Sequence, residues 1–283
     1  MSLSKISSAG FTGHATPTVT GLKGNSHMNM SRPSPPTLMF AITMVLALPT
    51  SALAQVRVLM SGGFRAAYQE LLPQFEKTAG ITVTTATGAS QGDGPNTISA
   101  QLRRGVPADV VIMSREGLAE LFTDGRIVTG SDVDLARVPL GVGVRAGTPR
   151  PDIGTVDAFK QTVLHAKSIG IQSTSAIYLK TTVFPRLGIG DAMAGKLSNA
   201  GAANVAKGEA EMVILPLSEI LPVPGVELVG TIPPEIQFDQ VFAAAVVKGA
   251  KDPDAAKRLI AFLASEKATP AVEKTGMKRT RLR

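Results

Sequence analysis

The sequence predicts an α/β protein, because patterns typical of strands and of helices alternate along most of the chain. The apolar run VRVLM at 56–60 leads directly into a helical pattern, and the β-branched segment 81–88 follows it. A short helical segment at 97–105 then precedes ADVVIM at 108–113, an apolar run typical of a strand buried in a parallel sheet. This order predicts a doubly wound layer of strands and helices.

Helix boundaries in this first part are marked by side-chain spacing and by residues at the ends. Phe64, Tyr68, Leu71 and Phe75 recur at helical spacing, which predicts a helix over 64–77 that ends at Gly80 and bends at Pro73. Ser114 is expected to cap the next helix, REGLAELFTDG.

A second α/β unit is predicted from about residue 138 onward. Thr155 is the expected N-cap of its first helix, and Asp252-Pro253 opens the last long helix of the chain. The remaining expected elements are strands at 140–147, 168–172, 211–215, 226–230 and 242–249, and helices at 155–166 and 176–187.

Residues 1–54 have the pattern of a leader and signal peptide rather than of a folded segment. They contain no acidic residue, and the short apolar block 38–48 is followed by a small-residue end at Ala54. We expect cleavage after Ala54 and no membrane insertion afterwards, because the apolar block is too short to span a bilayer. Translation starting at Met28 or Met30 would give a signal peptide of ordinary length. The alternative is an anchor that is retained.

Composition excludes several kinds of site. The formal net charge of +7 includes three cations of the leader, so residues 55–283 carry only +4, which suits a small anion better than nucleic acid. The chain has no Cys, and His165 is the only histidine after the leader. Thiol chemistry and a multi-histidine metal centre are therefore excluded, and we expect neither a metal nor a cofactor. Without Trp, the chain is also a poor candidate for a sugar-binding protein.

The segment VLMSGGFRAAY at 58–68 is the most informative one for function. A strand that ends at Ser61-Gly62-Gly63 and turns at once into a helix directs backbone N–H groups outward, and Arg65 adds a positive charge. Such a turn binds anions. The alternative is an ordinary tight turn in which glycine permits the backbone geometry.

The chain resembles the type 2 periplasmic solute-binding proteins, in particular their molybdate-binding branch. The similarity covers most of 56–277, and its most specific segment is RRGVPADVVIMSREGLAELFTDGRI. The resemblance implies two α/β lobes joined by hinge strands near 140–145 and 242–247. Lobe 1 would comprise 55–138 and 245–283, and lobe 2 would comprise 139–244.

The resemblance also implies a ligand site at turns that follow strands, as is usual in open α/β sheets. Each serine hydroxyl could equally act as a helix N-cap, above all that of Ser114. The positions that match the family's pocket, with Arg65 and Arg115 added as nearby cations, are Ser61, Gly62, Gly63, Phe64, Arg65, Ala89, Ser90, Ser114, Arg115, Ser173, Thr174, Ser175, Leu215 and Pro216.

Departures from the molybdate-binding pattern favour a larger ligand. Gly63 stands where the family's first turn offers a serine hydroxyl, and Leu215 stands where a tyrosine hydroxyl is expected. Arg65, Arg115 and Lys180 add cations, although each could be an ordinary surface charge. Because an arginine fork matches a planar carboxylate, an organic polycarboxylate is the expected ligand.

Three functions are compatible with this pattern. The favoured one is a monomeric periplasmic receptor that delivers an organic anion to an ABC permease. The alternative is a cofactor-free periplasmic aconitate isomerase, a known member of the wider family, and the third is a molybdate or tungstate receptor. No motif identifies a catalytic residue; the candidate bases are Tyr178, Glu219, Glu116 or a serine activated by Lys180.

Overall fold

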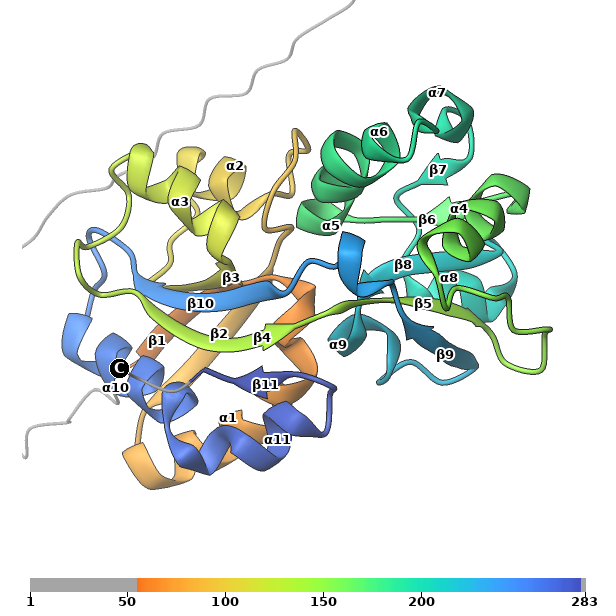
Figure 1. The fold of residues 1–283 in the computed structure, drawn as a ribbon. Coiled ribbons are helices and arrows are strands. Elements are labelled where there is room, and N and C mark those ends of the chain that lie inside the picture. Colours follow the sequence, from red (N-terminus) through yellow and green to blue (C-terminus); the bar gives the residue numbers. More distant parts are fainter. Residues whose placement is uncertain (1–54, 281–283) are drawn as a thin grey trace, which may run out of the picture. The chain divides into compact units, whose positions relative to one another are not determined.

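The computed structural model describes residues 55–280, which contain two mixed β-sheets with helices packed against them. The predicted signal peptide therefore lies outside the described residues. The sheets have the strand orders β11-β4-β10-β3-β1-β2 and β7-β6-β8-β5-β9 (Figure 1). None of the helices in this part of the chain is long and apolar enough to cross a membrane.

The first sheet is parallel at one edge and antiparallel at the other. Strand β1 pairs in parallel with β2 and β3, whereas β10 runs antiparallel to β3 and β4, and β11 runs antiparallel to β4. The strands are β1 (Gln55–Met60), β2 (Thr82–Thr87), β3 (Val110–Ser114), β4 (Val133–Val138), β10 (Gln240–Val246) and β11 (Lys278–Arg279).

The second sheet is also mixed. Strand β6 pairs in parallel with β7 and β8, and β5 runs antiparallel to β8 and β9. Its strands are β5 (Leu140–Arg145), β6 (Ile169–Gly170), β7 (Leu197–Ser198), β8 (Met212–Pro216) and β9 (Val226–Thr231).

Helices connect most of the strands along the chain. The described α-helices are α1 (Arg65–Ala79), α2 (Ile98–Arg103), α3 (Arg115–Thr123), α4 (Val156–His165), α5 (Ser173–Tyr178), α6 (Phe184–Arg186), α7 (Gly190–Met193), α8 (Ala202–Lys207), α9 (Leu217–Ile220), α10 (Pro253–Ala264) and α11 (Thr269–Glu273). A π-helical turn at Leu179–Val183 joins α5 to α6, and a 3₁₀ turn at Gly62–Phe64 precedes α1.

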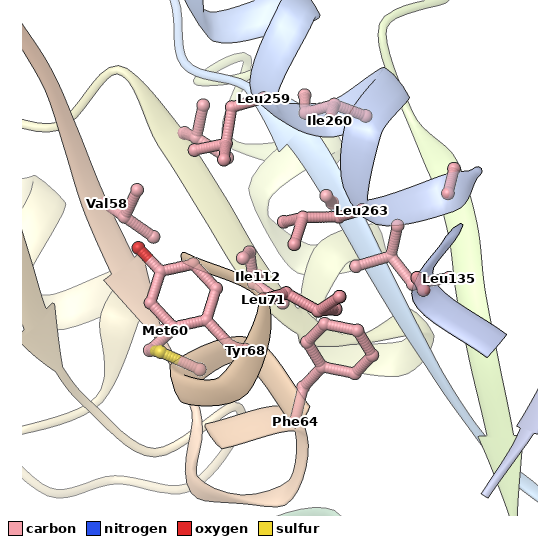
Figure 2. Close-up of a cluster of buried hydrophobic side chains, with 14 of the residues drawn as sticks. Val58, Met60, Phe64, Tyr68, Leu71, Ile112, Leu135, Leu259, Ile260 and Leu263 are labelled. Atoms are coloured by element: carbon pink, nitrogen blue, oxygen red, sulfur yellow. The ribbon is translucent and has the colours of Figure 1, made fainter. Parts of the chain in front are cut away.

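Side chains of the first sheet alternate between two hydrophobic cores. Val110 and Ile112 pack with α1, α10 and α11, whereas Val111 and Met113 pack with α2 and α3 on the opposite face. This alternation explains why the segment reads as a continuous apolar run, since both faces of the strand are covered. Figure 2 shows the first of these cores, in which Phe64, just before α1, and Leu71 of α1 lie against Leu263 of α10.

Two polar groups inside or beside this core have partners. Tyr68 is buried, and its hydroxyl bonds the Thr85 hydroxyl at 2.7 Å. Burial raises the pKa of Tyr68 to about 12. Asp109 is fully buried at the start of β3, where its carboxylate accepts hydrogen bonds from the Arg57 guanidinium (2.8 and 2.9 Å) and from the main-chain N–H of Lys251 (2.7 Å).

Replacing Asp109 with alanine should lower the free energy of unfolding by about 3 kcal/mol, because it leaves the buried N–H groups and Arg57 without their acceptor. Burial of Asp109 opposes its ionisation, but these hydrogen bonds outweigh it and lower the pKa of the carboxyl. The stabilisation is therefore present above the pKa of an unfolded aspartate, about 3.9, and is lost as the pH falls below it.

Urea unfolding at pH 7 checks this prediction, with Asp124→Ala as the control. Asp124 pairs with Arg103 at the surface (2.9 Å), where loss of an ion pair costs less than about 1 kcal/mol. An equal decrease in the free energy of unfolding in the two variants would contradict a larger structural contribution of Asp109.

The chain crosses between the sheets twice. The first crossing is at Pro139, between β4 and β5, and the second occupies 232–239, between β9 and β10. The side chain of Gln237 joins the crossings, because its oxygen accepts from the Leu140 N–H (2.9 Å) and its amide donates to the Leu140 carbonyl (3.0 Å). Strand β10 spans the predicted lobe boundary at 244/245 and lies wholly in the first sheet.

Several sequence predictions are confirmed. Thr155 caps α4 and Ser114 caps α3, through hydrogen bonds from the N–H groups of Ala158 (3.1 Å) and Gly117 (3.2 Å). Gly80 ends α1 in the left-handed conformation (φ 64°), and α1 continues through Pro73.

Other predictions were wrong in detail. The strand at 108–113 was expected in a parallel sheet; it pairs in parallel with β1 on one side, but β10 runs antiparallel on its other side. Strand β4 was not predicted, since Asp134 and Arg137 interrupt its apolar pattern. The helix expected at 176–187 begins at Ser173 and contains a π-helical turn.

Candidate functional site

A cavity of about 310 Å³ lies where turns of the first sheet face turns of the second. This volume is at the small end of the range for ligand sites in proteins. Most of the lining residues are small or uncharged and polar: Ser61, Gly62, Arg65, Thr87, Gly88, Ala89, Ser90, Asn96, Gln172, Ser173, Thr174, Ser175, Asn199, Glu219, Gln240 and Phe242.

The turn after β1 supplies a hydroxyl and a cation to the cavity. Ser61 is buried, and its hydroxyl has no hydrogen-bond partner among the described residues although its own N–H donates to the Ile112 carbonyl at 2.8 Å. A buried hydroxyl without a partner is costly unless a ligand or water satisfies it. Arg65, at the start of α1, is exposed and lines the same cavity.

The turn after β2 contributes differently from what the sequence pattern predicts. The N–H of Gly88 donates to the Met60 carbonyl (3.0 Å), and the N–H of Ala89 donates to the Asn96 carbonyl (3.1 Å). The Ser90 hydroxyl accepts from the Ser114 N–H (2.9 Å). The N–H groups of Gly88 and Ala89 are therefore already satisfied inside the protein.

The third wall consists of Ser173, Thr174 and Ser175 at the start of α5. The Thr174 hydroxyl bonds that of Ser114 (2.7 Å), and the Ser173 hydroxyl accepts from the Gln91 N–H (3.0 Å). These bonds connect the start of α5 to the turns of the first sheet. Ser173 also has a positive φ of 50°, which no other non-glycine residue of the described chain has.

The strained backbone of Ser173 gives a testable difference between two substitutions. Ser173→Ala and Ser173→Gly both lose the hydrogen bond from Gln91, but only glycine adopts a positive φ without steric cost. We therefore expect the glycine variant to be the more stable of the two by about 1 kcal/mol. Thermal unfolding of both variants measures this, and an alanine variant at least as stable as the glycine variant would argue against strain at Ser173.

Glu219 is the only acidic residue that lines the cavity. It lies in α9, immediately after β8, and its Oε2 is 3.6 Å from the position that a Cβ on Gly62 would occupy. Burial raises the pKa of Glu219 to about 7, and the positive charge of Arg65 opposes this rise. The cavity thus holds one cation and one carboxyl group whose pKa lies above its ordinary value.

Eight of the predicted ligand residues line the cavity, and six do not. The eight are Ser61, Gly62, Arg65, Ala89, Ser90, Ser173, Thr174 and Ser175. Phe64 is fully buried in the first core, and Leu215 of β8 is buried in a cluster with residues of α8 and α9. Neither side chain therefore lines the cavity. Pro216 is buried as the last residue of β8.

The other three predicted residues act behind the cavity wall. Ser114 is fully buried and supports Ser90 and Thr174. Arg115 points away to an ion pair with Asp132 (2.6 Å) and another with Asp134. Gly63 is buried under the Phe242 ring, whose Cζ lies 2.0 Å from where a Cβ on Gly63 would be.

Of the candidate bases Tyr178, Glu219 and Glu116, only Glu219 lines this cavity. The Tyr178 hydroxyl donates to the Ile236 carbonyl (3.1 Å), and its ring stacks on Phe238. Lys180 lines an adjoining cavity, which shares Ser173 and Asn199 with this one. Glu116 lies in the first turn of α3 and is absent from the lining.

The sequence pattern missed several polar residues of the lining. Gln240 is buried and lies two residues before Phe242 on β10, so both side chains lie on the same face of the strand. Asn199 follows β7, a strand of two residues that carries too little pattern to predict. Among the described residues no cluster of three His, Asp or Glu side chains could hold a metal ion.

Known proteins similar to this chain include an enzyme and several binding proteins. An aconitate isomerase of Pseudomonas sp. is 37% identical over 254 residues, which cover 87% of this chain and 97% of that protein. The periplasmic molybdate-binding protein of Azotobacter vinelandii has a TM-score of 0.63 at 21% identity, and covers 81% of this chain and 100% of its own.

A tungstate-binding protein of Desulfovibrio alaskensis has a TM-score of 0.57 at 12% identity, over 81% of this chain and 100% of its own. At such identities the two receptors share the fold of this protein. The family model described as bacterial extracellular solute-binding protein matches residues 56–278. The chain therefore belongs to the bacterial extracellular solute-binding protein family.

Proposed function

We propose that the protein interconverts cis- and trans-aconitate. The observation that carries this proposal is that one cation, Arg65, and one carboxyl group, Glu219, line the same small polar cavity, in a chain 37% identical to an aconitate isomerase along 97% of that enzyme. An ionised carboxylate in the site repels an anionic ligand, whereas an enzyme that moves a proton needs a base there.

The reaction is an allylic proton shift. A proton leaves the methylene carbon of aconitate, the double bond moves by one position, and a proton returns at the former vinyl carbon. Negative charge spreads onto the carboxylates between these steps, where a guanidinium and neutral donors can stabilise it. No electrons enter or leave, and Arg65, Ser61 and Gln240 supply a cation, a hydroxyl and an amide at the cavity wall.

Binding of a tetrahedral metal oxyanion is disfavoured at this site. The Phe242 ring occupies the space that a side chain at position 63 would need, with ring carbons 2.0–2.8 Å from the ideal Cβ position. The turn therefore has no room for a further hydroxyl donor beside Ser61. A single arginine suits a planar carboxylate better, because the guanidinium fork matches a carboxylate in two parallel hydrogen bonds.

A receptor that binds a polycarboxylate for an ABC permease is the second candidate, favoured by the fold shared with oxyanion receptors. In either case we propose that the protein acts in the periplasm, after export and loss of residues 1–54. N-terminal sequencing of the exported protein should begin at Gln55.

Incubation with each aconitate isomer, followed by chromatography, tests the proposed function. We expect conversion in both directions without added metal or cofactor. A thermal shift with aconitate but no conversion would leave the receptor as the correct assignment. A shift with molybdate alone would reject both.

A further inference from the structure

We propose that Glu219 is the catalytic base of this cavity, taking the proton from the methylene carbon of aconitate and returning it to the other end of the allyl system. The inference rests on the proposed function and adds the residue that performs the chemistry. Of the residues that line the cavity, only Arg65 and Glu219 carry ionisable side chains with a charge near neutral pH. Arginine remains protonated there, so it cannot accept a proton.

The position of Glu219 suits this role. Helix α9 starts directly after β8, at the sheet edge where ligands bind in open α/β folds, and it packs against the 3₁₀ turn that contains Gly62. Because Gly62 has no side chain, the Glu219 carboxyl faces the turn without obstruction, its Oε2 being 3.6 Å from the vacant Cβ position. Arg65, the first residue of α1, follows this 3₁₀ turn and lines the same cavity.

Arg65 is the charged residue that influences the pKa of Glu219, and the elements packed against α9 add no other charge near the carboxyl group. The turn Gly62–Phe64 and strand β8 contain no charged residue. Strands β5 and β9 carry one charged residue each, Arg145 and Glu227, and both are exposed. Arg145 lines a different cavity, beside Gly208.

The step balances without a further reactant. The Glu219 carboxylate forms an O–H bond as the methylene C–H bond breaks, and the electron pair of that bond enters the conjugated system as a dienolate. Arg65 stabilises the negative charge of the dienolate. The carboxylic acid then gives its proton to the former vinyl carbon, which restores the Glu219 carboxylate and leaves the double bond shifted. A pKa of about 7 makes this carboxylate a stronger base than an exposed one.

Steady-state kinetics of Glu219→Gln test the proposal. We expect kcat to fall at least 100-fold, the usual range for a general base, while KM for cis-aconitate changes less than about threefold. Glu219→Asp should recover part of the rate. In the wild type, kcat should rise with pH through the ionisation of Glu219, while the anion should bind more tightly at low pH, where the carboxyl is neutral.

A stability measurement separates this role from a structural one. Because burial raises the pKa of Glu219, its ionised form destabilises the fold above pH 7, so Glu219→Gln should raise the melting temperature at pH 8 and leave it nearly unchanged at pH 4. Glu227→Gln, on exposed β9, is the control and should keep wild-type kinetics.

The outcomes are distinguishable from failure of the proposed function. An inactive wild type that binds aconitate would reject the isomerase and this inference with it. Two results with an active wild type would overturn this inference but leave the proposed function standing. One is a Glu219→Gln variant that keeps more than a tenth of the wild-type kcat, and the other is a wild-type kcat that is flat between pH 5 and 9.

Discussion

Replacing Arg65 with alanine is expected to weaken aconitate binding by about 10- to 150-fold. The expectation follows from a charged hydrogen bond worth about 1.5–3 kcal/mol between the guanidinium and a carboxylate of the ligand. Arg65 is the only cation among the residues that line the cavity, so no neighbour replaces it. Isothermal titration calorimetry measures the affinity. Both proteins carry Glu219→Gln, which slows turnover, and they differ only at position 65.

Two further variants sharpen this result. Arg65→Lys keeps the charge but loses the planar fork, so its affinity should lie between those of the wild type and the alanine variant. Arg104→Ala removes an exposed arginine at the end of α2, outside the cavity, and should leave the affinity unchanged. An Arg65→Ala affinity equal to that of the wild type would remove this residue from the site.

Gly63→Ala should lower the free energy of unfolding by about 3 kcal/mol, the upper part of the usual range for overpacking a core. A Cβ at this position would lie 2.0 Å from the Phe242 Cζ and less than 3 Å from both Cε atoms, so the ring must move. Because Phe242 also lines the cavity, its displacement should weaken aconitate binding as well. Urea unfolding and titration calorimetry measure the two effects.

A double-mutant cycle identifies the cause of this loss. Phe242→Leu removes the ring that Gly63 accommodates, so the alanine should cost less in the Phe242→Leu background than alone. Gly190→Ala, at the start of α7 with no atom within 4 Å of the new methyl group, should be neutral or slightly stabilising. Additive costs in the cycle would contradict steric conflict with Phe242.

The alternation of strands and helices was predictable because each element carries its own periodicity and end residues. The mixed character of the first sheet was not, since the place of β10 beside β3 depends on a return from the second sheet over more than a hundred residues. The segment 242–247, expected as the second hinge strand, lies almost wholly in β10 of the first sheet, and the chain crosses between the sheets just before it, at 232–239.

The turns that surround the site were predictable, but the side chains that face it were only partly so. Arg115 follows a strand just as Arg65 does, yet its guanidinium is bound by Asp132 and Asp134. Asp134 lies in β4 and Asp132 just before it, and the sequence pattern did not reveal this strand. The turn after β8 was placed in the site through Leu215 and Pro216, whereas Glu219, three residues further, reaches the cavity. An acidic residue shortly after a buried apolar strand was the available signal.

The central claim is that this cavity catalyses a reaction rather than only retaining a ligand. Proton NMR of separate solutions of cis- and trans-aconitate, each with the purified protein, tests it most directly. The account predicts that both solutions reach the same ratio of isomers, at initial rates proportional to protein concentration and at least 100-fold lower for Glu219→Gln. Two unchanged spectra, with aconitate nonetheless bound, would contradict it and identify the protein as a receptor.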